Sequence, residues 1–162
     1  MGSRGRRWLV VAVVVLTIVE AWTVASTANA KKADSAARSA GEQFHAKLND
    51  GQYHDIYAGV DDEFRRAQTE PDFQRFLTAW RQKLGRFEEG AARTDNVNWR
   101  PQGTFVTLTY ESRFANGSVQ EEFTWVIKDT PKLWRYSINS ALLSASRTPT
   151  RPVRVRLVPV LA

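Results

Sequence analysis

Glu121 and Tyr110 are the two side chains of this sequence best suited to acid–base chemistry. Each lies in a stretch of alternating apolar and polar residues, a pattern that predicts neighbouring strands. If their shared face lines a cavity, Glu121 could act as a general base and Tyr110 could donate to a developing oxyanion. The competing prediction, which we favour, puts Glu121 at a solvated rim facing Arg113, because it lies just past the turn at Gly117.

Few other groups in the sequence could support catalysis. There is no cysteine, which excludes a thiol nucleophile, a thiolate ligand and a disulfide. The two histidines, His45 and His54, have neither metal-ligand spacing nor the partners of a catalytic triad. We therefore predict two solvated surface histidines, no metal, no cofactor and no catalytic residue.

Aromatic side chains on the same predicted strands are candidates to line a ligand pocket. They could stack on an apolar ligand, although tryptophan more often contributes core area. The candidate pocket residues are Tyr110, Glu121, Phe123, Trp125, Trp134 and Tyr136.

A sheet of consecutive antiparallel strands is expected to hold these residues. Three clear strands are predicted, over Thr104–Ala115, Ser118–Lys128 and Leu133–Ser140. Asn116-Gly117 predicts a two-residue hairpin turn, and Pro131 predicts the next turn. A fourth strand, kinked near Gly90, is expected within residues 86–99. The alternation leaves one apolar face that other elements must cover.

Helices are predicted before the sheet. Apolar spacing indicates a helix over Lys31–Leu48 and a short one from Tyr53. A third helix has an N-cap at Thr69 and a stop at Gly85. The fold class is therefore α+β, with N-terminal helices packed on a curved four-stranded antiparallel sheet to make a cone.

The apolar stripe of the third helix is the expected cover for the sheet. Its largest members are Phe76 and Trp80. We expect these two side chains to be buried against Val106, Leu108 or Phe123.

The basic residues are concentrated at the two ends of the chain. Of the net charge of +6, residues 1–30 carry +2 and residues 146–162 carry +4, which leaves no net charge on residues 31–145. A basic face that follows phosphates is not expected on the domain, so we predict no nucleic-acid binding.

Residues 1–30 have the pattern of an export signal. Three arginines precede an apolar run from Trp8 to Val19, and Ala28-Asn29-Ala30 fits a cleavage site. The alternative is an uncleaved membrane anchor over residues 8–27, which would bury Glu20 at a cost of about 2–3 kcal/mol. Either way we expect export to the periplasm or the extracytoplasmic face, with membrane contact only through residues 8–27 if they are kept.

Three parts of the chain are thus predicted. Residues 1–30 are a signal peptide or anchor, residues 31–145 are the α+β domain, and residues 146–162 are a basic, proline-containing tail that we expect to be flexible.

Short motifs along the domain carry a resemblance to a known family. They include LNDGQY at 48–53, WRQKLG at 80–85, GTFVTLTY at 103–110 and LWRYSI at 133–138. Through them the chain resembles the cystatin-like, nuclear-transport-factor-2-like superfamily, and it is similar to exported bacterial domains of unknown function of the DUF4019 type. The resemblance covers residues 33–140 and implies a fold and an exported location. It implies no reaction, because this superfamily contains both enzymes and binding modules.

Three functions remain open from the sequence. The leading prediction is an exported, non-enzymatic envelope domain that binds a small apolar ligand or an envelope protein. The alternative is a cavity enzyme of the isomerase or dehydratase kind that uses Glu121 and Tyr110. A third is an interaction module whose tail adds a strand to a partner's sheet. Burial of Glu121 beside Tyr110 at the base of a pocket would favour the enzyme.

Overall fold

The computed structural model describes residues 3–139, with side chains from residue 27 onward. Within this range four helices precede four strands. They are α1 (Ser3–Asp50), α2 (Tyr53–Ala58), α3 (Asp62–Ala67), α4 (Glu70–Leu84), β1 (Phe87–Arg100), β2 (Gly103–Phe114), β3 (Gly117–Ile127) and β4 (Pro131–Asn139). The chain divides into two units, residues 1–32 and 33–162, and the description below concerns the second.

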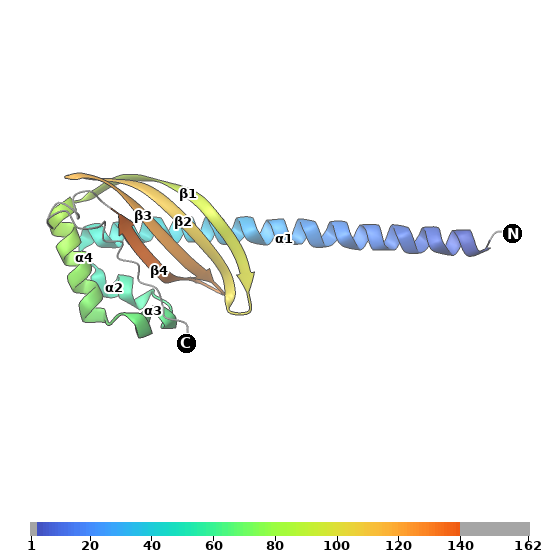
Figure 1. The fold of residues 1–162 in the computed structure, drawn as a ribbon, viewed down its shortest axis with the longest axis horizontal. Coiled ribbons are helices and arrows are strands. Elements are labelled where there is room, and N and C mark those ends of the chain that lie inside the picture. The colour runs from blue at the N-terminus through green and yellow to red at the C-terminus, as the bar shows by residue number, and fades with distance from the viewer. Residues whose placement is uncertain (1–2, 140–162) are drawn as a thin grey trace, which may run out of the picture. The chain divides into compact units, whose positions relative to one another are not determined.

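The four strands form one antiparallel sheet in the order β1-β2-β3-β4. The sheet is open and curved, and the helices of the second unit lie within its curve (Figure 1). This arrangement confirms the predicted α+β fold class. The predicted strands agree with β2, β3 and β4 to within one or two residues, although Ser140 lies outside the described residues.

The first strand has two irregularities in its pairing, where the sequence suggested one. β1 runs for 14 residues, and its register against β2 shifts between Phe87 and Glu89 and again between Thr94 and Asn96. The first shift lies close to the expected kink at Gly90. Such bulges bend an edge strand while the rest of the ladder stays paired.

Helix α4 covers the sheet as predicted. Thr69 caps its first turn by accepting from the Asp72 N–H, and Gly85 ends it at a φ of 77°. Trp80 is 2% exposed, which confirms its burial, whereas Phe76 is only partly buried. On the sheet, the ring neighbours of Trp80 are Phe114 at 5.3 Å and Tyr136 at 5.7 Å rather than the expected Phe123, so the helix packs on the β2–β3 turn end of the sheet.

The C-terminal part of α1 covers the remaining inner face of the sheet. Ala33, Ala37, Phe44 and Leu48 are buried there. Gly41 allows the helix to approach the sheet closely, because a Cβ at this position would overlap the Tyr110 hydroxyl.

The outer edge of β4 is partly occupied by the loop that joins α2 to α3. The Leu133 N–H donates to the Gly59 carbonyl at 3.0 Å, and the Asp61 N–H donates to the Leu133 carbonyl at 2.8 Å. Val60 thereby forms an isolated parallel bridge with Leu133.

The predictions for the chain ends concern residues that are largely outside the described part. No helix in the described part is long and apolar enough to cross a membrane. For the apolar run at residues 8–19 only the backbone is described. The tail at 146–162 lies outside the described residues.

Candidate functional site

Glu121 lies in the interior of the domain. It sits on β3 opposite Tyr110 of β2 and Ile138 of β4, and it is 0% exposed. The prediction of a solvated rim was therefore wrong. The β2–β3 turn is closed by the end of α4, since the Asn116 N–H donates to the Leu84 carbonyl at 2.9 Å. Arg113, the expected partner, pairs instead with Glu88 and Glu89.

Both carboxylate oxygens of Glu121 have buried partners. His45 Nε2 lies 2.9 Å from Oε2, and the Tyr136 hydroxyl donates to Oε1 at 2.8 Å. His45 is 2% exposed, so the prediction of a surface histidine was wrong for this residue. We call His45, Glu121 and Tyr136 the buried polar cluster. It joins α1 to β3 and β4 across the core.

A helical spacing could have revealed the burial of His45. Ala37, Gly41, His45 and Leu48 recur at intervals of four, four and three residues, which puts them on one face of α1. That face is the one that packs on the sheet. The carboxylate partner, 76 residues away, has no signal in the sequence.

The other histidine behaves as expected. The His54 side chain is 76% exposed, and its Nδ1 lies 2.6 Å from Glu70 Oε1. The hydrogen bond to Glu70, followed by that carboxylate's charge, raises the pKa of His54. His54 is thus a solvated surface residue, as predicted.

Aromatic rings enclose the imidazole of His45. The Phe87 ring stacks on it at 3.9 Å, while Tyr110 and Phe123 present their rings edge-on at 5.2 and 5.6 Å. These contacts leave the polar cluster in apolar surroundings, where a hydrogen bond is electrostatically stronger than in water.

The two tyrosines near Glu121 are held in their protonated form. Burial, together with the charge and hydrogen bond of Glu121, raises the pKa of Tyr136 well above its usual value. Burial is also the main reason that the pKa of Tyr110 is raised to about 12, with Glu42 the next contributor. Both phenols are therefore hydrogen-bond donors over the physiological pH range.

Tyr110 and Glu121 are neighbours, but no direct hydrogen bond between them is seen among the described contacts. The Tyr110 hydroxyl donates to the Arg38 carbonyl of α1 at 3.4 Å. Tyr136, which the sequence placed only among the pocket candidates, is the tyrosine that binds the carboxylate.

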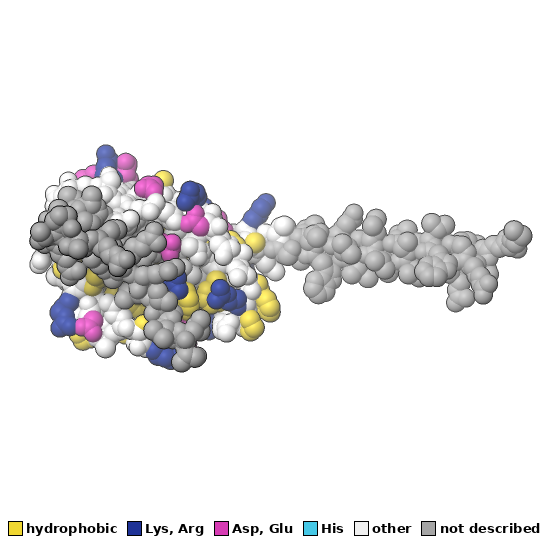
Figure 2. Space-filling view, in the orientation of Figure 1, with side chains coloured by type: hydrophobic (Ala, Val, Ile, Leu, Met, Phe, Trp, Pro, Cys, Tyr) yellow, Lys and Arg dark blue, Asp and Glu magenta, His cyan; other side chains and the backbone are white. Residues whose placement is uncertain are grey.

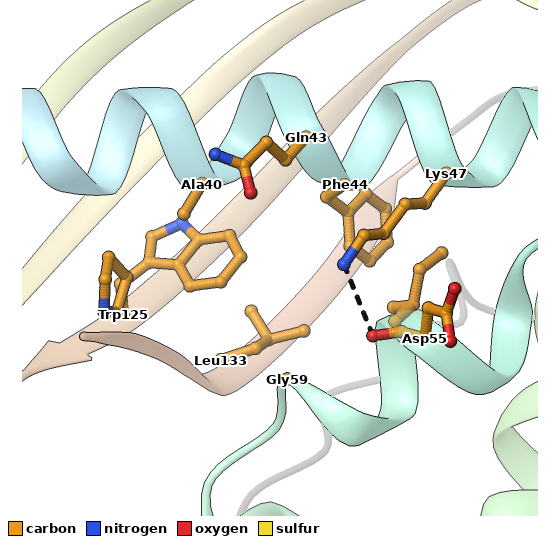
Figure 3. A pocket seen from close by; sticks show the side chains of 10 residues that line it. Ala40, Gln43, Phe44, Lys47, Asp55, Gly59, Trp125 and Leu133 are labelled. Atoms are coloured by element: carbon orange, nitrogen blue, oxygen red, sulfur yellow. Dashed lines mark hydrogen bonds between the residues drawn. The ribbon is translucent and has the colours of Figure 1, made fainter.

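A small pocket lies elsewhere, between α1, α2 and the start of β4 (Figure 3). Its volume is about 90 Å³. It is lined by Ala40, Gln43, Phe44, Lys47, Asp55, Ile56, Gly59, Trp125, Pro131 and Leu133. Of the six pocket candidates from the sequence, Trp125 lines it. Glu121 and Tyr136 belong to the polar cluster, and Tyr110 and Phe123 lie beside it in the core. Trp134 packs edge-on against Phe105 instead.

Two side chains of the pocket lining carry N–H donors. The Trp125 residue is 5% exposed, and its indole N–H has no acceptor among the described residues. Lys47 Nζ lies 3.5 Å from the Asp55 carbonyl oxygen, a contact at the limit of hydrogen bonding (Figure 3). The lining thus combines apolar walls with the Lys47 ammonium and with an indole N–H that is itself closed off from solvent. Across residues 27–139 no group of three or more metal-ligating side chains is found.

The fold and the buried polar cluster together describe a structural class. This is a small α+β domain in which helices cover one face of an open antiparallel sheet and seal a polar cluster between the layers. The chain belongs to the DUF4019 family, a protein family of unknown function, whose model matches residues 40–137. The matched range contains all three members of the polar cluster and the whole pocket lining. No curated protein matches the sequence.

Proposed function

We propose that this domain is a non-enzymatic binding module of the cell envelope. It accepts an apolar group, from a small ligand or from an envelope protein, in the pocket beside Trp125. We further propose that it belongs to the nuclear-transport-factor-2-like, cystatin-like superfamily, which residues 33–50 of the first helix, lying within a curved sheet, support (Figure 1).

The observation that carries the proposal is the buried indole N–H of Trp125 beside an apolar pocket. An unsatisfied buried donor costs about 1–3 kcal/mol. A bound group that turned or displaced the indole enough to reach its N–H with an acceptor atom would remove that cost, while its apolar part contacts Phe44, Ile56 and Leu133.

The size of the pocket limits what it accepts. Its volume of about 90 Å³ is enough for only a few water molecules. Sites for drug-sized molecules have volumes of roughly 300–1,000 Å³. The pocket therefore suits one aliphatic side chain of a protein partner, or a molecule of only a few heavy atoms.

The enzyme alternative is supported by the burial of Glu121. Glu121 is buried and lies opposite Tyr110, which a cavity enzyme would need. Each carboxylate oxygen, however, has a protein donor, and the pocket described above has neither Glu121 nor Tyr110 in its lining. A general base must lie within hydrogen-bonding distance of the substrate proton that it removes. The binding module is therefore the reading that the geometry favours.

A titration with butan-1-ol tests the pocket directly. This probe has a short apolar tail and a hydroxyl oxygen that can accept from the Trp125 indole. We expect the indole N–H resonance of Trp125, assigned with Trp125→Phe, to shift as the alcohol is added. Ala40→Leu should abolish the shift by filling the pocket. Ala46→Leu, on the exposed side of the same helix, should retain it.

The partner itself is sought by crosslinking in the envelope. A photo-crosslinking residue at Gln43 should give a product of defined mass in the parent chain and in Ala46→Leu, but not in Ala40→Leu. A product that persists in Ala40→Leu, with no response of Trp125 to the alcohol, would contradict the proposal.

A further inference from the structure

We infer that the end of the β1–β2 hairpin docks on the surface of an anionic lipid bilayer. The hairpin tip is Trp99, Arg100, Pro101 and Gln102. This inference goes beyond the pocket function and does not depend on it.

The first observation is the exposure of Trp99. It is 74% exposed, and it is the large hydrophobic side chain left exposed among residues 27–139. Trp80 and Trp125, by contrast, are 2% and 5% exposed. Tryptophan is enriched where a protein meets the headgroup region of a membrane, because its ring is apolar and its N–H is polar.

Cationic side chains flank this tryptophan. The Arg100 guanidinium lies over the Phe105 ring at 4.8 Å, which holds it at the tip. Lys128 follows the end of β3 beside the hairpin, since a Cβ on Gly103 would lie 3.1 Å from its Cγ. Asp129 follows in the β3–β4 turn and Lys132 lies at the start of β4, so residues 99–103 and 128–132 carry a net charge of +2. Figure 2 shows hydrophobic and cationic side chains side by side at this end of the folded domain.

The tip lies at the end of the domain where the chain enters it. α1 runs antiparallel to β1, because His45 stacks on Phe87 whereas Arg38 donates to the Ala92 carbonyl at 2.8 Å and Asp34 accepts from Thr94. Following α1 toward Ala33 therefore leads toward the far end of β1, where Trp99 lies.

The sequence before Ala33 would tether this end of the domain to a membrane if its apolar run is kept. The apolar run ends at Val19, 14 residues before Ala33. If that run is kept as an anchor, a tether of this length is at most about 50 Å when extended and about 20 Å when helical. The same end of the domain is then held near the bilayer. A tryptophan between cations at that end matches the chemistry of an anionic headgroup layer.

The absence of cysteine allows a clean test with the full chain in vesicles. Gln102→Cys places a single labelling site in the tip, and Ser118→Cys places a matched site at an exposed position near the start of β3, at the opposite end of the sheet. Each carries an environment-sensitive fluorophore. The chains are reconstituted in vesicles of phosphatidylcholine with phosphatidylglycerol, and in phosphatidylcholine alone.

We expect the label at residue 102 to shift to the blue and brighten in the anionic vesicles, while the label at residue 118 keeps the emission of a water-exposed probe. Trp99→Ser should remove most of the response. Lys128→Gln should lower the ratio of docked to free tip about five-fold, the effect of one cation near an anionic surface.

Three outcomes would overturn the inference. A water-like emission at residue 102 in anionic vesicles would show that the tip stands away from lipid. An equal response at residue 118 would show that contact is not specific to the tip. An equal response in phosphatidylcholine alone would show that anionic lipid is not recognised.

Discussion

The imidazole of His45 lies flat against the phenyl ring of Phe87, with ring centroids 3.9 Å apart and planes 2° from parallel. One turn further along α1, Asn49 exchanges two hydrogen bonds of 2.8 Å with the main chain of Phe87. The first residue of β1 is therefore fixed to α1 through both its ring and its backbone. This stack orients the imidazole so that Nε2 meets Glu121.

Removing the Glu121 carboxylate should destabilise the fold, because His45 and Tyr136 would then be left as buried donors without an acceptor. We expect Glu121→Ala to lower the free energy of unfolding by about 3–5 kcal/mol, as when one partner of a buried pair is deleted. Glu121→Gln keeps an oxygen for the Tyr136 hydroxyl and should cost only about 1–2 kcal/mol. Urea unfolding followed by circular dichroism measures both. Equal effects of the two variants would show that the carboxylate's hydrogen bonds do not stabilise the fold.

Gly41 should resist a change that usually stabilises a helix. Alanine is favoured over glycine in helix interiors by about 1 kcal/mol. Here the added Cβ would overlap the Tyr110 hydroxyl, so we expect Gly41→Ala to lower the midpoint of thermal unfolding. Tyr110→Phe should relieve part of that loss in the double variant, because it removes the clashing oxygen. Ser39→Ala, on the exposed side of α1, should change the midpoint little.

Two tryptophans, one buried and one exposed, test the packing of α4 on the sheet. Trp80→Ala should lower the free energy of unfolding by about 3–5 kcal/mol, because it empties a buried site between α4 and the sheet. Trp99→Ala should change it by less than about 0.5 kcal/mol in detergent-free solution, since the side chain is exposed. Similar losses in both variants, measured by urea unfolding, would contradict the packing of α4.

The free energy of unfolding should decrease at alkaline pH, because buried tyrosines such as Tyr110 resist losing their proton in the folded state. An unfolded tyrosine has a pKa of about 10, whereas burial raises the pKa of Tyr110 to about 12 in the folded domain. The folded state therefore holds the proton more tightly. Its advantage is complete below the unfolded pKa and is lost as pH rises through the folded one. Unfolding midpoints measured between about pH 9 and about pH 12 should decline less steeply in Tyr110→Phe. A decline identical to that of the parent would exclude Tyr110 as a cause.

Local patterns in the sequence were sufficient to predict most of the fold. The alternation around Val106 and Phe123 predicted β2 and β3, and Asn116-Gly117 predicted their turn. Thr69 and Gly85 predicted the ends of α4 because capping depends on residues that are close in sequence. These signals need no knowledge of the partner that an element packs against.

The candidate site was harder to predict because its contacts are distant in sequence. Distance from Gly117 along the strand suggested an exposed Glu121, but the end of α4 covers that turn. His45 was judged by the absence of a ligand motif, although its place on the buried face of α1 was visible in the spacing. Tyr136 was predicted to contact a ligand, and it binds Glu121 instead.

The loop between Gly59 and Asp61 also bears on aggregation. An exposed edge strand can template pairing with a second chain, and natural proteins block such edges with proline or with covering segments. β4 has both devices at its start: Pro131 lacks an N–H, and the N–H and carbonyl of Leu133 are already bonded to Gly59 and Asp61. Edge-to-edge polymerisation cannot begin at Leu133 unless this loop first detaches from the sheet.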